Sequence, residues 1–275
     1  MRFTVHHLTI YRYSAPVRLA QHLLRLNPRP DAGRLLAREL TIDPAPFLRE
    51  DAADGFGNLV TRVDFEEPSD HLLIDSRFEF EVGAAAANAP PPPLPWPVEA
   101  DGPNAVYCGN GAINGAVGAF AAEIAAECGG DALAFLDRLN ETLYARIDRR
   151  MREEGAARSA EETLALGSGA CRDLTALFVA ACRSLGAPAR FVSGYQAQAD
   201  APDGRRHLHA WPEAFVPGWG WRAYDPTHGV PVTDGHVPLC AAPEQTQTMP
   251  VEGGFFGGPV KSRLAYEIEI AAERS

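Results

Sequence analysis

The stretch Gly167-Ser168-Gly169-Ala170-Cys171-Arg172-Asp173-Leu174 decides how this chain is interpreted, because it places a cysteine at the start of an apolar helix. Gly186 and Pro188 mark the end of that helix. The first N–H groups of a helix lack intrahelical partners, and the helix dipole is positive there. Both effects favour a thiolate at Cys171, and the thiolate is the nucleophilic form. The apolar face of the helix recurs at helical spacing and comprises Leu174, Leu177, Phe178, Ala181, Cys182 and Leu185.

Two later stretches supply the other groups that a thiol nucleophile needs, namely 206–211 (RHLHAW) and 224–227 (YDPT). Cys171, His209 and Asp225 follow one another in the order nucleophile, base and orienting carboxylate. We expect strands over 207–216 and 221–224. His209 and Asp225 share a face if these strands pair with an even register, as a three-residue loop at 217–219 gives. An odd register without a bulge would separate them.

Composition narrows the class of protein. The 275 residues carry a net charge of −11, which argues against a general nucleic-acid or anionic-membrane surface. We find no secretory segment at the N-terminus and no apolar run of the roughly 20 residues that a membrane span needs. The five cysteines do not resemble a disulfide framework, and a reducing cytoplasm is the simplest location. The sequence leaves the oligomeric state open.

The chain divides into three parts by composition. Residues 1–82 contain several short alternating segments, which predict a β-sandwich-like or barrel-like module. Residues 83–105 are rich in alanine and proline and are interpreted as a semi-rigid linker, with a lid or an embracing segment as the alternative. Residues 106–275 form the third part, in which we expect helices followed by antiparallel strands and a last strand over 263–270. The predicted class is α+β.

Local signals place the helices of the third part. Residues 112–151 are helical in pattern, and Asp131 is the expected N-cap of their second half. Ser159 and Glu162 fit a capping box for a short helix that ends at Leu166 and leads into the cysteine turn. Residues 19–26 fit either a helix or a buried strand, because periodicity alone does not distinguish them.

Four blocks of this sequence carry a resemblance to a known family: GACRDL, LGAPARFVSGY, HAWPEAF and GWGWRAYDPT. In order and spacing they resemble the transglutaminase-like superfamily over about residues 159–229. The first eighty residues, with YRYSAPV and DGFGN, resemble the β-sandwich that precedes the core in the bacterial subgroup, whose members are often described as cysteine proteases. The resemblance implies a papain-like core and a catalytic triad of Cys171, His209 and Asp225. It names no substrate.

Two departures from the family pattern matter. Pro212 follows His-Ala-Trp where the family commonly has an apolar or aromatic residue. A proline cannot donate to a sheet ladder, so this position requires an edge, a bulge or a non-bonding site. No acidic loops like those of calcium-dependent animal transglutaminases are present, so we expect no metal and no other cofactor.

The residues therefore predict acyl transfer through a Cys171 thioester on a peptide or protein amide, with His209 as base and then acid. Asp173 is expected to complement the helix dipole. His207 could equally be the base by residue type, since it lies on the same strand face as His209; the family resemblance selects His209. Further cleft residues are predicted at Arg172, Tyr195, His207 and Trp211.

Three other interpretations remain at this stage. Ligands for zinc could come from a His207-x-His209 pair with Asp225, His228 and Cys171. An inactive binding or scaffold module could retain the fold without the chemistry. An arylamine-type acetyl-transfer enzyme uses the same triad, but its cysteine lies much closer to the N-terminus.

Overall fold

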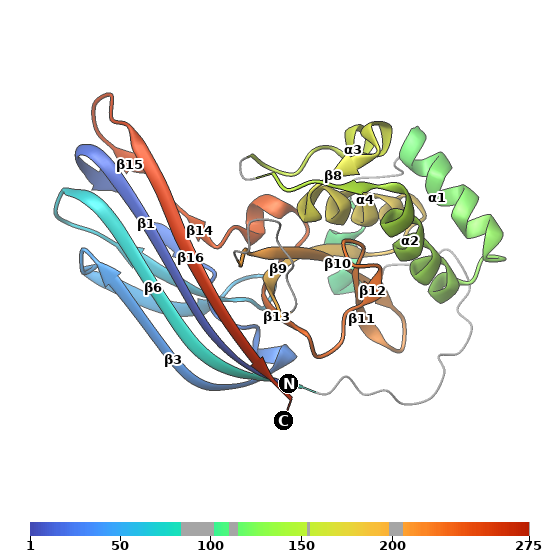
Figure 1. Cartoon of the computed structure of the whole chain (residues 1–275), viewed down its shortest axis with the longest axis horizontal. Coiled ribbons are helices and arrows are strands. Elements are labelled where there is room, and N and C mark those ends of the chain that lie inside the picture. Colours follow the sequence, from blue (N-terminus) through green and yellow to red (C-terminus); the bar gives the residue numbers. More distant parts are fainter. Residues whose placement is uncertain (84–101, 110–114, 153–154, 198–205, 275) are drawn as a thin grey trace.

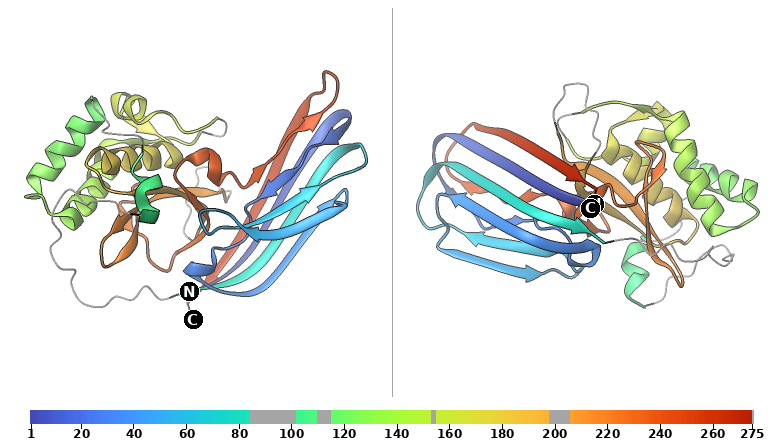
Figure 2. Two further views of the ribbon diagram at one scale, coloured as in Figure 1. Left: turned by 180° about the vertical axis from the view of Figure 1, so that it is seen from behind. Right: turned by 60° about the horizontal axis from the view of Figure 1, so that its bottom comes forward.

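A computed structural model describes residues 1–83, 102–109, 115–152, 155–197 and 206–274. The molecule is a mixed α/β protein in which a β-sandwich stands beside a half built from helices and a second sheet (Figure 1). The N- and C-termini lie next to each other at the base of the sandwich in every view (Figures 1 and 2). Within the described part of the chain, no helix is both long and apolar enough to cross a bilayer.

The first 82 residues are built from strands, as predicted. One sheet has β1 at its centre, with β6 and then β3 on one side and β15 and β16 on the other. The second sheet has the order β14-β2-β5-β4. The ambiguous segment 19–26 contains a strand, β2, rather than a helix. The strands of this region are β1 (Arg2–Leu19), β2 (His22–Leu24), β3 (Gly33–Asp43), β4 (Leu48–Ala53), β5 (Leu59–Asp64) and β6 (Ser69–Val82).

The C-terminal strands correct the predicted domain boundary. The sequence places all of 106–275 in one unit, but β14 (Val251–Glu252), β15 (Phe255–Phe256) and β16 (Ser262–Glu273) belong to the sandwich. β16 pairs with β1 from Arg2↔Glu273 to Tyr13↔Ser262. The sequence correctly predicts this strand, but of its apolar face only Ile268 is buried and Ile270 half-buried, and alternation does not say which sheet a strand joins. The linker prediction concerns 83–105, of which 84–101 lie outside the described residues.

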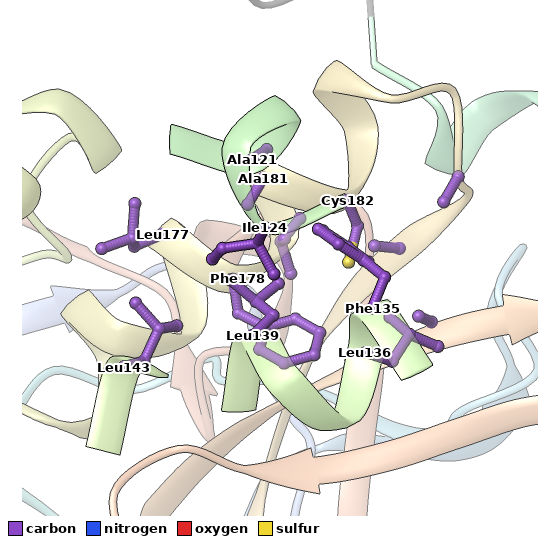
Figure 3. Close-up of a cluster of buried hydrophobic side chains, with 14 of the residues drawn as sticks. Ala121, Ile124, Phe135, Leu136, Leu139, Leu143, Leu177, Phe178, Ala181 and Cys182 are labelled. Atoms are coloured by element: carbon purple, nitrogen blue, oxygen red, sulfur yellow. The ribbon is translucent and has the colours of Figure 1, made fainter. Parts of the chain in front are cut away.

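The other half contains an antiparallel sheet of order β12-β11-β10-β9-β13, with α4 and α2 packed on one side of it and α1 and α3 packed on α4. The apolar face of α4 packs with α1 and α2 in a buried cluster that includes Leu177, Phe178 and Cys182 (Figure 3). The N-cap predictions are confirmed, since Asp131 accepts bonds at the start of α2 and Ser159 does so for α3. The elements are α1 (Ala116–Glu127), α2 (Ala132–Arg146), β7 (Asp148–Arg149), α3 (Ala160–Leu166), β8 (Ser168–Gly169), α4 (Cys171–Ser184), β9 (Ala189–Gln196), β10 (His209–Val216), β11 (Gly220–Asp225), β12 (Val230–Pro231) and β13 (His236–Ala242).

The two halves share buried contacts. Phe3, Phe78 and Phe80 of the sandwich pack with Tyr195 of β9 and Val237 of β13 in one apolar cluster. The DGFGN turn supplies a polar link to the same sheet. Asn58 is fully buried, and its side chain both accepts from Ala241 N at 2.8 Å and donates to Ala241 O at 2.9 Å. These contacts fix the sandwich against the back of the sheet that carries the site.

A buried histidine at this junction makes stability depend on pH. The ring of His7 is 2.8 Å from Tyr195 Oη and 3.2 Å from Thr9 Oγ1. Burial, and next the charge of His6, lower the pKa of His7 to about 4. Between pH 6.5 and about 4 the unfolded chain therefore binds a proton at this residue that the folded chain does not bind. Stability is fully present above this window and falls as the pH falls through it.

We expect the titration of His7 to lower the free energy of unfolding by up to about 3 kcal/mol as the pH falls through this window. Denaturant titrations at a series of pH values measure this loss, and His7→Gln should flatten the slope. His71→Gln is the control, because His71 is partly exposed and its pKa is raised by Asp70 and Asp43. An unchanged slope in His7→Gln would contradict the assignment.

Candidate active site

Cys171 is the first residue of α4 and is partly exposed, whereas Cys182 and Cys240 are buried. The short strand β8, which precedes Cys171, pairs in parallel with β7. Gly169 is required here because a Cβ at this position would lie 2.8 Å from Asp173 Cβ. The short turn thus brings the helix start, and the thiol with it, to the ends of the sheet strands.

Asp173 does more than complement the helix dipole. Its side chain is fully buried and accepts three hydrogen bonds, from Ala170 N (2.8 Å), Arg158 N (2.8 Å) and Arg152 Nη2 (2.6 Å). Ala170 N is one of the helix-start donors that need a partner. Asp173 therefore joins the residue before Cys171 to the chain that leads into α3, a role that the sequence analysis misses.

The β10–β11 hairpin has the even register that the triad requires. Glu213 pairs with Ala223 and Val216 with Gly220, which leaves the predicted loop at 217–219. His209 is the first residue of β10 and lies opposite Gly194 of β9. A Cβ at Gly194 would lie 2.2 Å from Val237 O and 2.6 Å from the Trp211 ring, so only glycine fits beside this histidine.

Pro212 lies in a central strand, and its place explains how a proline is accommodated. Phe215 N donates to Pro188 O, so the backbone of Phe215 faces β9. Backbone groups alternate sides along an antiparallel strand, so the backbone of Pro212, three residues earlier, faces β11. The pairing of β10 with β11 ends at Glu213↔Ala223 and does not extend to the adjacent Pro212. Pro212 pairs with Phe191 of β9 without a register shift, so no bulge changes the face of His209.

Cys171, His209 and Asp225 form one contiguous line. His209 Nε2 is 2.8 Å from Asp225 Oδ2, which leaves Nδ1 for the thiol. The His209 ring and the backbone of Ala210 lie close enough to the thiol of Cys171 to lower its pKa. Burial opposes the charged forms of Cys171 and His209. The charge of Asp225 outweighs burial and raises the pKa of His209 to about 10. His209 in turn holds the pKa of Cys171 below its ordinary value.

Asp225 is surrounded by more donors than a triad requires. Besides His209, its Oδ2 accepts from His228 Nδ1 at 2.9 Å, His236 Nε2 at 3.0 Å and Gln196 Nε2 at 3.4 Å. Burial raises the pKa of this carboxyl, but the adjacent His209 and the hydrogen bonds from the three imidazoles reverse the effect and hold it far below the ordinary value. Asp225 therefore stays ionised beside the His209 imidazolium.

His236 is buried, and its Nδ1 has no hydrogen-bond partner among the described residues. Burial lowers the pKa of His236 despite the bond to Asp225, so it donates Nε2–H to the carboxylate as a neutral imidazole. His236 pairs with Gln196 across β13 and β9, which brings both side chains to the Asp225 side of the sheet. The sequence analysis misses both residues, because it assigns no strand to 236–242.

The other predicted cleft residues are placed differently. Tyr195 is fully buried between the two halves and bonds His7, and Trp211 is buried against Val192 and Ala241. His207 precedes β10, so it does not share a strand face with His209; its Nδ1 is 2.8 Å from Tyr266 Oη of β16. Arg172 remains beside the thiol, with its Nη2 bonded to Arg152 O at 2.7 Å.

The residues predicted to bind zinc are not all brought together, because His207 contacts Tyr266 instead. The polar atoms of His209, Asp225 and His228 do lie within 4.8 Å of one another. However, both imidazoles direct a ring nitrogen at the same carboxylate oxygen, at 2.8 and 2.9 Å. These are hydrogen-bond distances that a proton on each ring satisfies.

Comparison with known proteins agrees with this geometry. Residues 3–81 match the bacterial transglutaminase-like N-terminal region, and residues 118–226 match the transglutaminase-like superfamily. The chain belongs to the transglutaminase-like superfamily. The residues matched to the superfamily core include Cys171, His209 and Asp225. Membership of this superfamily supports a thiol-dependent function.

Individual relatives of this transglutaminase-like protein cover nearly all of its length. Uncharacterized proteins from Mycobacterium bovis and Mycobacterium tuberculosis are 26% identical over 300 residues, covering 98% of this chain and 92% of theirs. A crystal structure from Cytophaga hutchinsonii, named "a Putative Cysteine Protease", superimposes with a TM-score of 0.73 at 20% identity and covers 100% of this chain and 91% of its own. That likeness establishes the shared fold of sandwich and core.

Proposed function

We propose that this protein is a cysteine acyltransferase or amidohydrolase that acts on a peptide or protein amide through a thioester. The proposal rests chiefly on one observation: a partly exposed thiol at a helix start contacts an imidazole whose other nitrogen is 2.8 Å from a fully buried carboxylate. The three residues come from α4, β10 and β11. A thiol, base and orienter in mutual contact are the parts of an activated nucleophile.

The first step forms the thioester. Cys171 Sγ attacks the amide carbonyl carbon, and the oxygen becomes an oxyanion. The N–H of Cys171 lies at the helix start and is a suitable donor to that oxygen. The C–N bond then breaks, and His209 gives its Nδ1 proton to the departing nitrogen. The amine or ammonia leaves, and the acyl group remains on sulfur.

The second step releases the acyl group. Water or an amine loses a proton to His209 as it attacks the thioester carbonyl, and Cys171 departs as the thiolate beside the regenerated imidazolium. Water gives hydrolysis and an amine gives transfer. Throughout both steps Asp225 holds the ring so that Nδ1 faces the sulfur.

We further propose that the protein works in a reducing compartment, the cytoplasm, without a metal or other cofactor. Supporting the location, all five cysteines are free thiols, and burial raises the pKa of Cys182 and of Cys240, which keeps both in the unreactive form. The expected partner is an amide substrate, and neither a nucleic acid nor a membrane is proposed, in keeping with the net charge of −11.

The test is the pH dependence of Cys171 alkylation, read by peptide mass spectrometry. We expect rapid labelling that persists well below the ordinary thiol pKa of about 8.5, and a rate near pH 6 at least about tenfold lower in His209→Ala. Cys128 is the internal reference, since burial raises its pKa. An ordinary titration of Cys171 that His209→Ala leaves unchanged would favour the scaffold interpretation.

A further inference from the structure

The outer edge of β16 is a long strand edge that has neither a bulge nor a proline. β16 has 12 residues, and among the described residues it pairs only with β1, so its other edge carries unpaired backbone groups (Figures 1 and 2). Folded proteins normally protect an edge with bulges, prolines or inward-facing charges. The opposite edge of this sheet, β3, does carry a register shift.

The two faces of β16 differ. Its inward-facing positions from Leu264 onward are apolar, and two of them are largely exposed, Leu264 at 55% and Tyr266 at 45%. Its outward-facing charged residues are Arg263 near the N-terminal end and Glu267, Glu269 and Glu273 toward the C-terminal end. Such a strand is complementary to itself when a second copy runs antiparallel to it.

We propose that two copies of this chain pair through their β16 edges, with the two-fold axis at Ala265. In that register Leu264 lies opposite the partner's Tyr266, which covers the exposed apolar side chains of both copies. On the other face Arg263 lies opposite the partner's Glu267. Symmetry repeats this contact, so one strand pair gains two pairs of opposite charge.

Registers with the axis at Glu267 or Ile268 are less favourable, and an axis at Tyr266 would keep one opposite-charge contact, Arg263 with the partner's Glu269, but leave Glu267 opposite Ala265. An axis at Ile268 would bring Glu267 opposite the partner's Glu269, and an axis at Glu267 would bring this residue opposite its own copy. Like charges directly opposite each other destabilise a strand pair. The Ala265 register also relieves a local repulsion, because Arg263 lies opposite Arg12 on β1 and the partner's Glu267 supplies the counter-charge.

A cavity of about 720 Å³ borders β16 from Tyr266 to Ala271 and is also lined by Thr4 and His6 of β1 and by Arg206. In the proposed register the partner's residues 262–264 run along this edge beside residues 266–268. The partner's Leu264 then lies beside Tyr266, whose hydroxyl bonds His207 two residues before His209. Pairing would thus place the second copy at the margin of the candidate active site.

Sedimentation velocity of the full chain over a concentration series tests the proposal, independently of any catalytic activity. We expect the native protein to dimerise, and Arg263→Glu to raise the dissociation constant at least about tenfold, because two attractive pairs become repulsive. Glu267→Arg should have the same effect. The double variant Arg263→Glu with Glu267→Arg restores both pairs and should return the dissociation constant to near the native value.

Arg146→Glu is the matched control, since it makes the same charge change at an exposed position on α2. It should leave the dimer intact. A monomer at every concentration would overturn the proposal and leave the β16 edge to an extended substrate peptide. A dimer that neither single variant weakens, or that the double variant fails to restore, would overturn this register and this surface.

Discussion

Asp225→Asn is expected to slow alkylation of Cys171 near pH 6 by roughly 10- to 100-fold. Burial by itself lowers the pKa of His209, and Asp225 is what raises it to about 10. Without the carboxylate the ring is neutral and no longer holds a thiolate. An Asn amide that donates to Nε2 would also move the ring proton to Nδ1, which faces the thiol, and so leave no base there.

The measurement is the rate of labelling of the Cys171 peptide across pH, together with the thiolate absorbance that Cys171→Ser removes. Cys182 and Cys240 report on folding in the same experiment, because both are buried and should stay unlabelled. His228→Gln is the matched control. It removes one donor from the same Asp225 oxygen, but its ring is partly exposed, so its effect should be smaller. A rate in Asp225→Asn that equals the native rate would contradict the proposed role of Asp225.

The hairpin geometry is predictable from sequence because it depends only on local spacing. A three-residue loop at 217–219 requires an even register, and an even register brings His209 and Asp225 to one face. The contact of 2.8 Å between them then follows from strand geometry. The helix that carries Cys171 is likewise predictable from its apolar periodicity and from Gly186, which marks its end.

What the sequence does not reveal is pairing between distant segments. Gln196 and His236 reach Asp225 because β13 pairs with β9, and β16 joins β1 across almost the whole chain. Alternation predicts a strand but not its partner. Tyr195 shows the same limit, because an aromatic residue near a predicted cleft is equally suited to a buried interface, and the position of the sandwich makes it the latter.

The structure also separates two kinds of carboxylate that look alike in the sequence. Asp225 and Asp173 are both fully buried. Asp225 accepts from imidazoles and controls the charge of His209, whereas Asp173 accepts from two backbone N–H groups and Arg152. In the proposed mechanism the first tunes the base and the second fixes the position of the nucleophile. Substituting Asp225 should therefore slow alkylation chiefly near pH 6, whereas substituting Asp173 should lower stability and slow alkylation at every pH.

Asp173→Ala is expected to lower the free energy of unfolding by about 3–5 kcal/mol, because it leaves the buried Ala170 N–H and the partly buried Arg158 N–H without their acceptor and removes the carboxylate that pairs with Arg152. It should also slow Cys171 alkylation at every pH, since the turn at 167–170 loses the bond that fixes Ala170. Asp131→Ala is the matched control. Asp131 caps α2 through Leu133 N and Ala134 N, far from the thiol, so its loss should cost about 1 kcal/mol and leave alkylation unchanged.

Asp173→Asn tests whether shape alone suffices. Its amide nitrogen must replace either Oδ1, which faces Arg152 and Arg158 N, or Oδ2, which faces Ala170 N. A donor therefore meets a donor in either orientation, and even this nearly isosteric change should destabilise the fold. Denaturant unfolding of the three variants ranks the losses. Equal losses in Asp173→Ala and Asp131→Ala would mean that Asp173 is an ordinary helix cap, and that the position of Cys171 is held by the packing of α4 instead.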